Sequence, residues 1–326
     1  MTGVAVTGVT GSATEGTSWA LVATVKAPLA HVLGFLAWHL DLGASKITLC
    51  FDDPEDPALA ALADHASARV QLIACDAAHW QALGGRPERH QNRQAKNARM
   101  VYRQGGCDWL GHIDIDEFIW PAAPVANLLA DLPADQILCR MEPFEALHDP
   151  TLPDDIFTAQ AFRAPLKPRH AGLRGPALGR YATILPEGML SHSAGKLFFR
   201  SGIKGLSPRL HGAFIGGERL PGPDFHPGLQ LLHFHAQDRA SWLAALPFRL
   251  TRGAYQYRPE MQAWLAGASA DEIADFYQTT QSLQAGAAAD LRKAGRLVEA
   301  RLDLRRRIAA EFAQIPLETL SKKGSI

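Results

Sequence analysis

The chain has 326 residues, 47% hydrophobic and 20% charged, which is enough to bury a large core in one domain with an appendage or in two domains. Lys plus Arg and Asp plus Glu each number 33, so the overall charge gives no reason to expect a nucleic acid partner. The four cysteines lack zinc-knuckle spacing and are expected to be reduced structural thiols. Residues 1–18 do not resemble a cleavable signal peptide, and we expect a disordered leader there.

The first part of the chain alternates between apolar runs typical of strands and amphipathic patterns typical of helices. Strands are predicted at 19–25, 46–51 and 69–74, with helices between them at 29–42 and 56–67. A helix at 91–104 precedes a strand at 108–115, and Pro124 opens a short helix before a strand at 136–141. This order predicts an α/β fold with a doubly wound, mostly parallel sheet whose strand ends meet at one edge.

The second part of the chain has a different character. From about residue 143 to 230 it is rich in Pro, Gly, His and Arg, which predicts loops and short antiparallel strands. After about residue 238 the pattern is helical to the end, with Pro316 marking a late stop. The most apolar segment, around residues 27–38, is too short to span a bilayer, and we expect a cytoplasmic protein.

The segment Asp108–Pro121, with the sequence DWLGHIDIDEFIWP, brings three carboxylates to the end of a predicted strand. Alternation along that strand places Asp114 and Asp116 on one face, roughly 6.6 Å apart. At this separation the two charges repel by roughly 2.5 kcal/mol at an effective dielectric near 20. A divalent cation such as Mg²⁺ or Mn²⁺ would relieve the repulsion, because these ions prefer oxygen ligands. A solvated turn is the alternative, although the apolar Phe118 follows Glu117 at once.

This segment resembles the Asp-Trp-x-x-x-Ile-Asp-Ile-Asp-Glu-Phe signature of the family 2-like glycosyltransferases, near the group that includes the family 92 enzymes. Other landmarks follow in the family's order: 20–26, 38–43, 51–53, 195–200, His211, 232–235 and 241–243. The resemblance covers about residues 19–255 and implies a GT-A type fold. It implies a catalytic domain at 19–237, divided into a nucleotide-sugar half at 19–142 and an acceptor half at 143–237, and then a helical region at 238–326.

The resemblance implies an enzyme of polysaccharide biosynthesis that moves a sugar from a nucleoside-diphosphate sugar to a hydroxyl of a glycan or lipid-linked acceptor, with inversion. Its metal ligands would be Asp114, Asp116 and His233, and one imidazole among oxygen ligands suits Mn²⁺ or Mg²⁺ better than zinc. The candidate nucleotide-sugar-binding residues are Asp52, Asp53, Arg93, Asp114, Lys196 and His211. Solvated turns or surface charges are the alternative for each of them.

The general base is open among Glu142, Glu145 and Asp149, which follow the predicted strand at 136–141, and Glu145 is our choice. The chain departs from the family pattern at Ala27-Pro28, where many members have Asn-Glu, and at His112. Two other functions remain as alternatives. One is a nucleotide-sugar-binding protein without turnover, and the other is a phosphohydrolase that uses Asp114 as its nucleophile.

A single basic helix is predicted at residues 291–312, where seven Lys and Arg side chains face two acidic ones up to residue 307. Apolar residues recur along it at roughly helical spacing. One interpretation is a helix docked on the catalytic domain with a solvated basic side. The other is peripheral attachment to anionic lipid at the inner face of the membrane.

Overall fold

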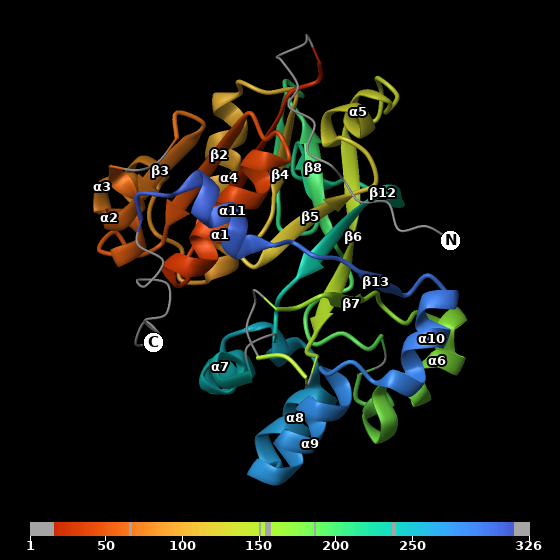
Figure 1. Ribbon diagram of the computed structural model, residues 1–326. Coiled ribbons are helices and arrows are strands. Elements are labelled where there is room, and N and C mark those ends of the chain that lie inside the picture. The colour runs from red at the N-terminus through yellow and green to blue at the C-terminus, as the bar shows by residue number, and fades with distance from the viewer. Residues whose placement is uncertain are drawn as a thin grey trace.

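The computed structural model describes residues 16–64, 67–149, 151–153, 158–185, 187–236 and 239–315. A ten-stranded mixed sheet forms its centre, with the order β13-β7-β6-β8-β4-β1-β2-β3, while β12 pairs with β5 and β6 beside this path. Helices flank this sheet, as Figure 1 shows. The expected α/β class with a carboxyl-terminal helical extension is confirmed. The leader is predicted at residues 1–18, and its first 15 residues lie outside the part of the chain that the structure describes.

The strands nearest the amino terminus form a parallel half of the sheet: β1 (Trp19–Val25), β2 (Lys46–Phe51), β3 (Val70–Ala74) and β4 (Trp109–His112). The helices that connect them are α1 (Leu29–Asp41), α2 (Pro57–Ala63), α3 (Ala77–Ala82) and α4 (His90–Gln104). Both β1 and β2 begin and end where the sequence predicts. Their side chains are almost all buried, as expected for strands covered on both faces.

The other half of the sheet is mixed and contains β5 (Glu117–Pro121), β6 (Leu138–Leu147), β7 (Ala161–Arg163), β8 (Lys196–Arg200) and β12 (Phe225–His233). The strand β8 pairs antiparallel with β4 and β6, whereas β12 pairs antiparallel with β5 and parallel with β6. A separate small sheet contains β9 (Leu206–Pro208), β10 (Ala213–Ile215) and β11 (Glu218–Arg219). The short helix α5 (Val125–Ala130) follows Pro124 as predicted.

The strand β6 is longer than the predicted strand at 136–141. It continues to Leu147 because its second half pairs with β12 on one side and with β7 on the other. The strand β12 lies far along the chain, so local pattern could not reveal this pairing. Glu142 and Glu145 therefore lie within the strand and not after it, which corrects the expectation for both residues.

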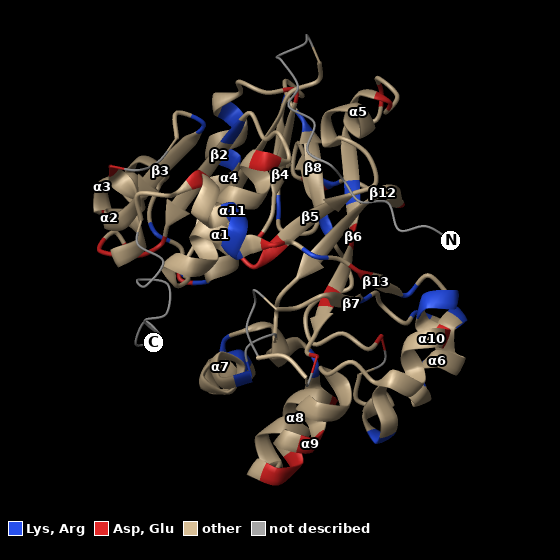
Figure 2. Cartoon of the chain, in the orientation of Figure 1, with Lys and Arg blue, Asp and Glu red and all other residues tan. Residues whose placement is uncertain are grey.

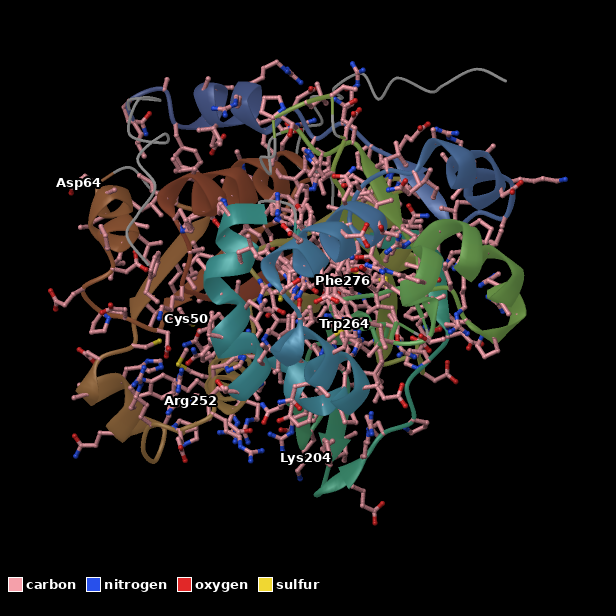
Figure 3. The ribbon with its side chains drawn as sticks, turned by 90° about the horizontal axis from the view of Figure 1, so that it is seen from below. Cys50, Asp64, Lys204, Arg252, Trp264 and Phe276 are labelled. Atoms are coloured by element: carbon pink, nitrogen blue, oxygen red, sulfur yellow. The ribbon has the colours of Figure 1, made fainter. Side chains whose placement is uncertain are left out.

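The carboxyl-terminal region is mainly helical and contains α7 (Arg239–Thr251), α8 (Pro259–Gly267), α9 (Ala270–Thr280), α10 (Ala285–Lys293) and α11 (Leu304–Glu311). The helices α7 to α10 pack with α6 (Ala171–Leu178) around a second apolar core, together with the 3₁₀ segments Gly179–Ala182 and Ala254–Tyr257. A further 3₁₀ segment, Pro168–His170, precedes α6. Trp264 and Phe276, labelled in Figure 3, stack in this core with ring centroids 5.3 Å apart.

The prediction of one basic helix at 291–312 is wrong. The helix α10 ends at Lys293, Gly295 has a φ of 65°, and β13 (Leu297–Glu299) then pairs antiparallel with β7. The helix α11 begins only after Asp303, whose φ is 49°. The apolar spacing in this segment therefore arises from three short elements and not from one helix.

The basic side chains of this segment lie on different elements, and several of them have acidic partners. Arg292 pairs with Glu299 at 2.6 Å, Arg296 pairs with Glu142 at 2.7 Å, and Arg307 pairs with Asp41 of α1. Figure 2 shows the resulting blue segments on separate elements. The surface expected to attach to anionic lipid is therefore not present as a single helix face. Among the described helices, none is both long and apolar enough to cross a membrane.

The last elements return to the central sheet. The strand β13 extends the sheet beyond β7, and α11 packs against α1, with Leu304 and Ile308 in the same apolar core as β1. All four cysteines are free, as expected. The division at residue 237 stays a prediction.

Gly111 in β4 lies where another side chain would not fit. A Cβ atom there would lie 2.6 Å from Leu21 Cδ2 and 2.8 Å from Phe198 Cε1. We expect Gly111→Ala to lower the free energy of unfolding by about 1–3 kcal/mol through overpacking. Gly34 in α1 is a matched control, because its Cβ would meet Leu304 Cδ1 at an ordinary 3.5 Å and Ala favours a helix. Urea unfolding of the two variants checks this, and equal stability of both would contradict it.

His39 links α1 to β5 as a neutral imidazole. Its Nδ1 lies 2.9 Å from the Phe35 carbonyl oxygen, and its Nε2 lies 3.2 Å from the Ile119 backbone nitrogen, which donates to it. Burial lowers the pKa of His39 from 6.5 to about 3. Below pH 6.5 the unfolded chain therefore binds more protons than the folded chain at this residue. Stability from this group is present above pH 6.5 and is lost as the pH falls towards 3.

We expect this residue to destabilise the fold by up to about 1.4 kcal/mol for each pH unit below 6.5. His39→Gln removes the titrating group, so urea unfolding between pH 6.5 and pH 4 should show a shallower loss of stability than in the unaltered protein. Identical pH slopes for the two proteins would show that His39 does not carry this effect.

Candidate active site

The candidate site lies at the carboxyl ends of the parallel strands. The strand β1 lies between β2 and β4, and the chain moves outward from it first to β2 and β3 and later to β4. In doubly wound sheets such a reversal of strand order opens a crevice beyond the strand ends, where ligands bind. Lys26 directly follows β1, and Asp114 follows β4 by two residues. The sequence motif therefore occupies the part of the fold where a ligand site is expected.

A tight turn, and not a strand, presents the three carboxylates. The strand β4 ends at His112, and β5 begins at Glu117. The Glu117 backbone N–H donates to the Asp114 carbonyl at 3.1 Å, and the Asp114 backbone N–H donates to Glu117 Oε2 at 2.7 Å. The expectation that Asp114 and Asp116 share one face of a strand reaching residue 115 is therefore wrong, although the turn still gathers all three side chains in one place.

Asp114 is held by two side chains from other elements. Its Oδ2 lies 2.5 Å from Lys196 Nζ on β8, and its Oδ1 accepts a hydrogen bond of 2.7 Å from Gln94 Nε2 on α4. Burial alone would raise the pKa of Asp114, but Lys196 holds it well below its usual range. Lys196 is fully buried and also lies 3.4 Å from Glu117 Oε2. Both oxygens of Asp114 are thus already engaged.

Glu117 lies beneath the turn. Its side chain is fully buried, and burial raises its pKa even though Lys196 opposes this. Its Oε1 lies 3.2 Å from Nε2 of His192 and 3.9 Å from Nδ1 of His233. Glu117 therefore connects the turn to the histidines of two other segments.

Asp116 is the most accessible of the three carboxylates, with 31% of its side chain exposed. Its Oδ2 lies 3.3 Å from Nε2 of His233, the last residue of β12. Burial alone would lower the pKa of His233, but Asp116 and Glu117 raise it to about 9. Asp116 and His233, two of the predicted metal ligands, come from different segments of the chain and are in direct contact.

Among the residues that the structure describes, two groups of side chains have the spacing of a metal site, and both include His233. One is Asp116, His233 and His235, and the other is Glu117, His192 and His233; the ligand atoms of each group lie within 4.8 Å of one another. In neither case is Asp114 a member. The Nδ1 atoms of His192 and His233 are buried and have no hydrogen-bond partner. Buried donor atoms without partners fit a cation, because a buried polar atom otherwise needs a hydrogen bond.

The residues proposed to bind the nucleotide-sugar donor are connected to this cluster through α4, where Gln94 contacts Asp114 and the adjacent Arg93 pairs with Asp52. A cavity of about 1010 Å³ opens at the ends of β1, β2 and β3, and Lys26, Asp52, Asp53 and Trp80 are among the residues that line it. Arg93 does not line the cavity but pairs with Asp52 at 2.8 Å, and so joins α4 to the end of β2. The oxygen Oδ1 of Asp53 accepts from the backbone of Glu55, which caps the turn after β2.

The remaining predicted residues have defined partners too. The ring of His211 lies 4.1 Å from that of His192, and its Nδ1 lies 2.8 Å from the Gly195 carbonyl oxygen. Glu145 is fully buried, and its two oxygens accept backbone N–H groups of Leu190 at 2.9 Å and Ser191 at 2.6 Å. Glu145 thus fixes the segment that carries His192 beside the metal-site candidates.

Sequence reasoning missed Gln94 and His192. Gln94 lies on the helix predicted at 91–104, and His192 lies in the region rich in Pro and Gly, where no regular pattern places a side chain.

No family model matches the sequence, and no curated protein matches it. Solved structures with some likeness include GalNAc-T7 with UDP, GalNAc and Mn²⁺ (TM-score 0.34, 13% identity, 92% of this chain and 58% of that one). Others are S. aureus TarS 1-349 (0.31, 10%, 91% and 92%) and the galactosyltransferase LgtC with donor and acceptor sugar analogues (0.26, 14%, 56% and 57%). The chain thus spans little more than half of GalNAc-T7 and LgtC. Likenesses this weak carry no information about function.

Proposed function

We propose that this protein is a metal-dependent glycosyltransferase that moves a sugar from a nucleoside-diphosphate sugar to a hydroxyl of a glycan or lipid-linked acceptor, with inversion. The observation that carries the proposal is the position of the carboxylate and histidine cluster. It lies at the reversal of strand order, beside a cavity formed by the ends of the neighbouring parallel strands. The glycosyltransferase-like sequence motif forms the turn that builds this cluster.

Asp116 and His233 are the proposed metal ligands. They are in contact with each other, Asp116 is open to solvent, and His233 belongs to both candidate groups. His235, the third member of the group that contains Asp116, would complete the shell, so the site offers more imidazole than the sequence suggested. This ligand set suits Mn²⁺ better than Mg²⁺, which prefers oxygen ligands alone. When bound, the ion would stabilise the negative charge that develops on the departing nucleoside diphosphate.

Asp114 is proposed to serve the donor. Since Lys196 and Gln94 hold both of its oxygens, it is fixed in one orientation beside the diphosphate position. The same contacts disfavour a phosphohydrolase, because a nucleophilic carboxylate needs an oxygen that is free to attack. Asp52, Asp53 and Lys26 line the cavity that would take the nucleotide, and Arg93 is proposed to act through Asp52. Lys196 is proposed to act through Asp114, and His211 through the neighbouring His192.

Glu145 stays the proposed general base among the three sequence candidates. Glu142 pairs with Arg296, and Asp149 accepts hydrogen bonds from Thr151. Glu145 on β6 is the register partner of His233 on β12, so of the three candidates it is the one paired with a proposed metal ligand. To accept the proton of an acceptor hydroxyl, its carboxylate must exchange one of its backbone hydrogen bonds for that hydroxyl.

Turnover of a panel of nucleoside-diphosphate sugars with Mn²⁺ tests the proposal. A glycosyltransferase releases nucleoside diphosphate from one donor class in a Mn²⁺-dependent reaction, and a chelator stops this release. A protein that binds a donor tightly but releases no nucleoside diphosphate with any acceptor mixture would be a binding protein, and the proposed activity would be wrong.

A further inference from the structure

A second pocket, lined by basic residues, shares a wall with the candidate nucleotide cavity. We call it the basic pocket. It has a volume of about 470 Å³ and is lined by Gly84, Gly85, Arg86, Pro87, Asn92, Lys96, Arg99 and Arg209. Gly84, Gly85 and Arg86 line both this pocket and the nucleotide cavity. Four of the eight lining residues are therefore cationic, and none is acidic.

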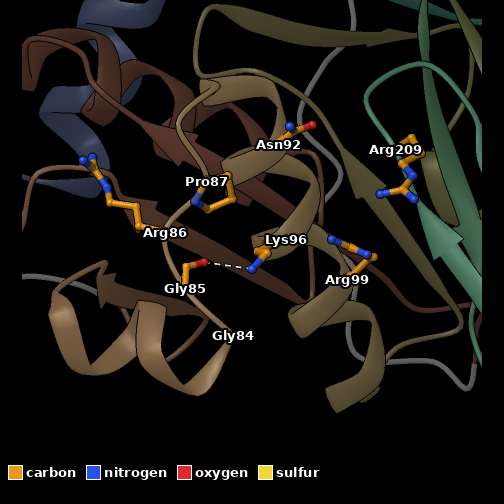
Figure 4. A pocket seen from close by; sticks show the side chains of 8 residues that line it. All are labelled: Gly84, Gly85, Arg86, Pro87, Asn92, Lys96, Arg99 and Arg209. Carbon is orange, nitrogen blue, oxygen red and sulfur yellow. Dashed lines mark hydrogen bonds between the residues drawn. The ribbon is translucent and has the colours of Figure 1, made fainter.

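The charges of this pocket are only partly compensated. Arg86 pairs with Asp52, and Figure 4 shows its side chain turned away from Lys96. Lys96 donates to the carbonyl oxygens of Leu83 at 2.7 Å and Gly85 at 2.8 Å, which positions its ammonium group but leaves the charge in place. No carboxylate among the described residues forms an ion pair with Lys96, Arg99 or Arg209.

The two arginines come together from distant parts of the chain. Arg99 lies on α4, whereas Arg209 follows β9, and both line the same side of the pocket in Figure 4. The Arg99 Nε donates to the Ala95 carbonyl at 3.1 Å, so the outer nitrogens of the guanidinium group remain available. Burial and the neighbouring charges of Arg209 and Arg103 lower the pKa of Arg99. Holding like charges together in this way is unfavourable unless an anion joins them.

We propose that the basic pocket binds a phosphate group, with Arg99, Arg209 and Lys96 as the residues that hold it. Two guanidinium groups and an ammonium group match the tetrahedral oxygens of a phosphate, which accepts paired hydrogen bonds from arginine. The phosphate belongs either to the donor's diphosphate, reaching across the shared wall, or to a second, phosphorylated molecule. Phosphate binding at this pocket does not require the proposed transferase activity.

Calorimetric titration with inorganic phosphate, at constant ionic strength and without divalent ions, tests the proposal. We expect the unaltered protein to bind phosphate, and Arg99→Gln and Arg209→Gln each to weaken binding about tenfold or more. Arg103→Gln is the matched control, because Arg103 is an exposed basic residue one turn further along α4 that does not line the pocket. It should change the affinity by less than about twofold. Thermal unfolding of each variant verifies the fold.

Failure of the unaltered protein to bind phosphate more tightly than chloride would overturn the proposal, and so would an Arg103→Gln effect as large as that of Arg99→Gln. A second titration with saturating nucleoside diphosphate identifies the source of the phosphate. Unchanged phosphate affinity assigns the pocket to a second molecule, whereas a lower phosphate affinity of the unaltered protein assigns it to the donor's diphosphate. Because no turnover is measured, absence of transferase activity would leave this result standing.

Discussion

Asp116→Ala is expected to leave the protein folded and to lower the rate of sugar transfer by about a hundredfold or more. Asp116 is partly exposed, so its loss leaves no large buried cavity. Metal stabilisation of a departing diphosphate supplies several kcal/mol, and about 1.4 kcal/mol corresponds to a tenfold change in rate. Steady-state release of nucleoside diphosphate at saturating Mn²⁺ measures the effect.

Asp64→Ala is the control for this variant. Asp64 is an exposed aspartate at the end of α2, labelled in Figure 3, far in the chain from the cluster. We expect it to retain full activity and the same Mn²⁺ requirement. Full activity of Asp116→Ala, or of the unaltered protein in a chelator, would rule out the metal mechanism.

Lys196→Met is expected to lower the free energy of unfolding by about 3–5 kcal/mol, because removal of one member of a buried ion pair leaves the other charge without compensation. Lys196 is fully buried and is the cation nearest to both Asp114 and Glu117. The loss should shrink at low pH, because burial without Lys196 raises the pKa of both carboxyl groups in the variant and they become neutral more readily. Urea unfolding at pH 5 and pH 8 measures both effects.

Lys204→Met provides the comparison for this variant, since Lys204 is exposed and labelled in Figure 3 at the edge of the molecule. It should change stability by no more than about 0.5 kcal/mol. If the two methionine variants have equal stability, then Lys196 does not hold the carboxylate turn together.

The parallel half of the fold could be predicted because its signals are local. The apolar run Trp19–Val25 and the helical pattern that starts at Leu29 lie in the chain in the order in which they pack. The early end of β4 could not be predicted, since a hydrogen bond between the Glu117 side chain and the Asp114 backbone ends it. The alternation of apolar residues continues through that turn, so the sequence pattern there is the same as that of a continuous strand.

The carboxyl-terminal segment misled prediction for the opposite reason. Its apolar residues have helical spacing, but Gly295 and Asp303 adopt positive φ angles that interrupt a helix. The three residues of β13 pair with β7. The strand β7 lies more than 130 residues earlier in the chain, and its pairing makes residues 297–299 a strand. The local periodicity of the sequence does not indicate this pairing.

The candidate site residues stay predictions, but the motif and His233 are in contact, because the end of β12 lies beside the turn. The positions of Gln94 and His192 depend on how α4 and the segment held by Glu145 fold over that turn. Such contacts between distant segments become visible only in the folded chain.

A crystal structure with Mn²⁺ and a nucleoside diphosphate tests the central claim most directly. We predict one anomalous manganese peak at a coordination distance of about 2.0–2.3 Å from both Asp116 and His233, with diphosphate oxygens on the same ion and the nucleoside in the cavity lined by Asp52 and Trp80. His235 should complete the shell. A diphosphate bound at this edge with no ion on Asp116 or His233, or a nucleoside bound elsewhere on the protein, would contradict the proposed site.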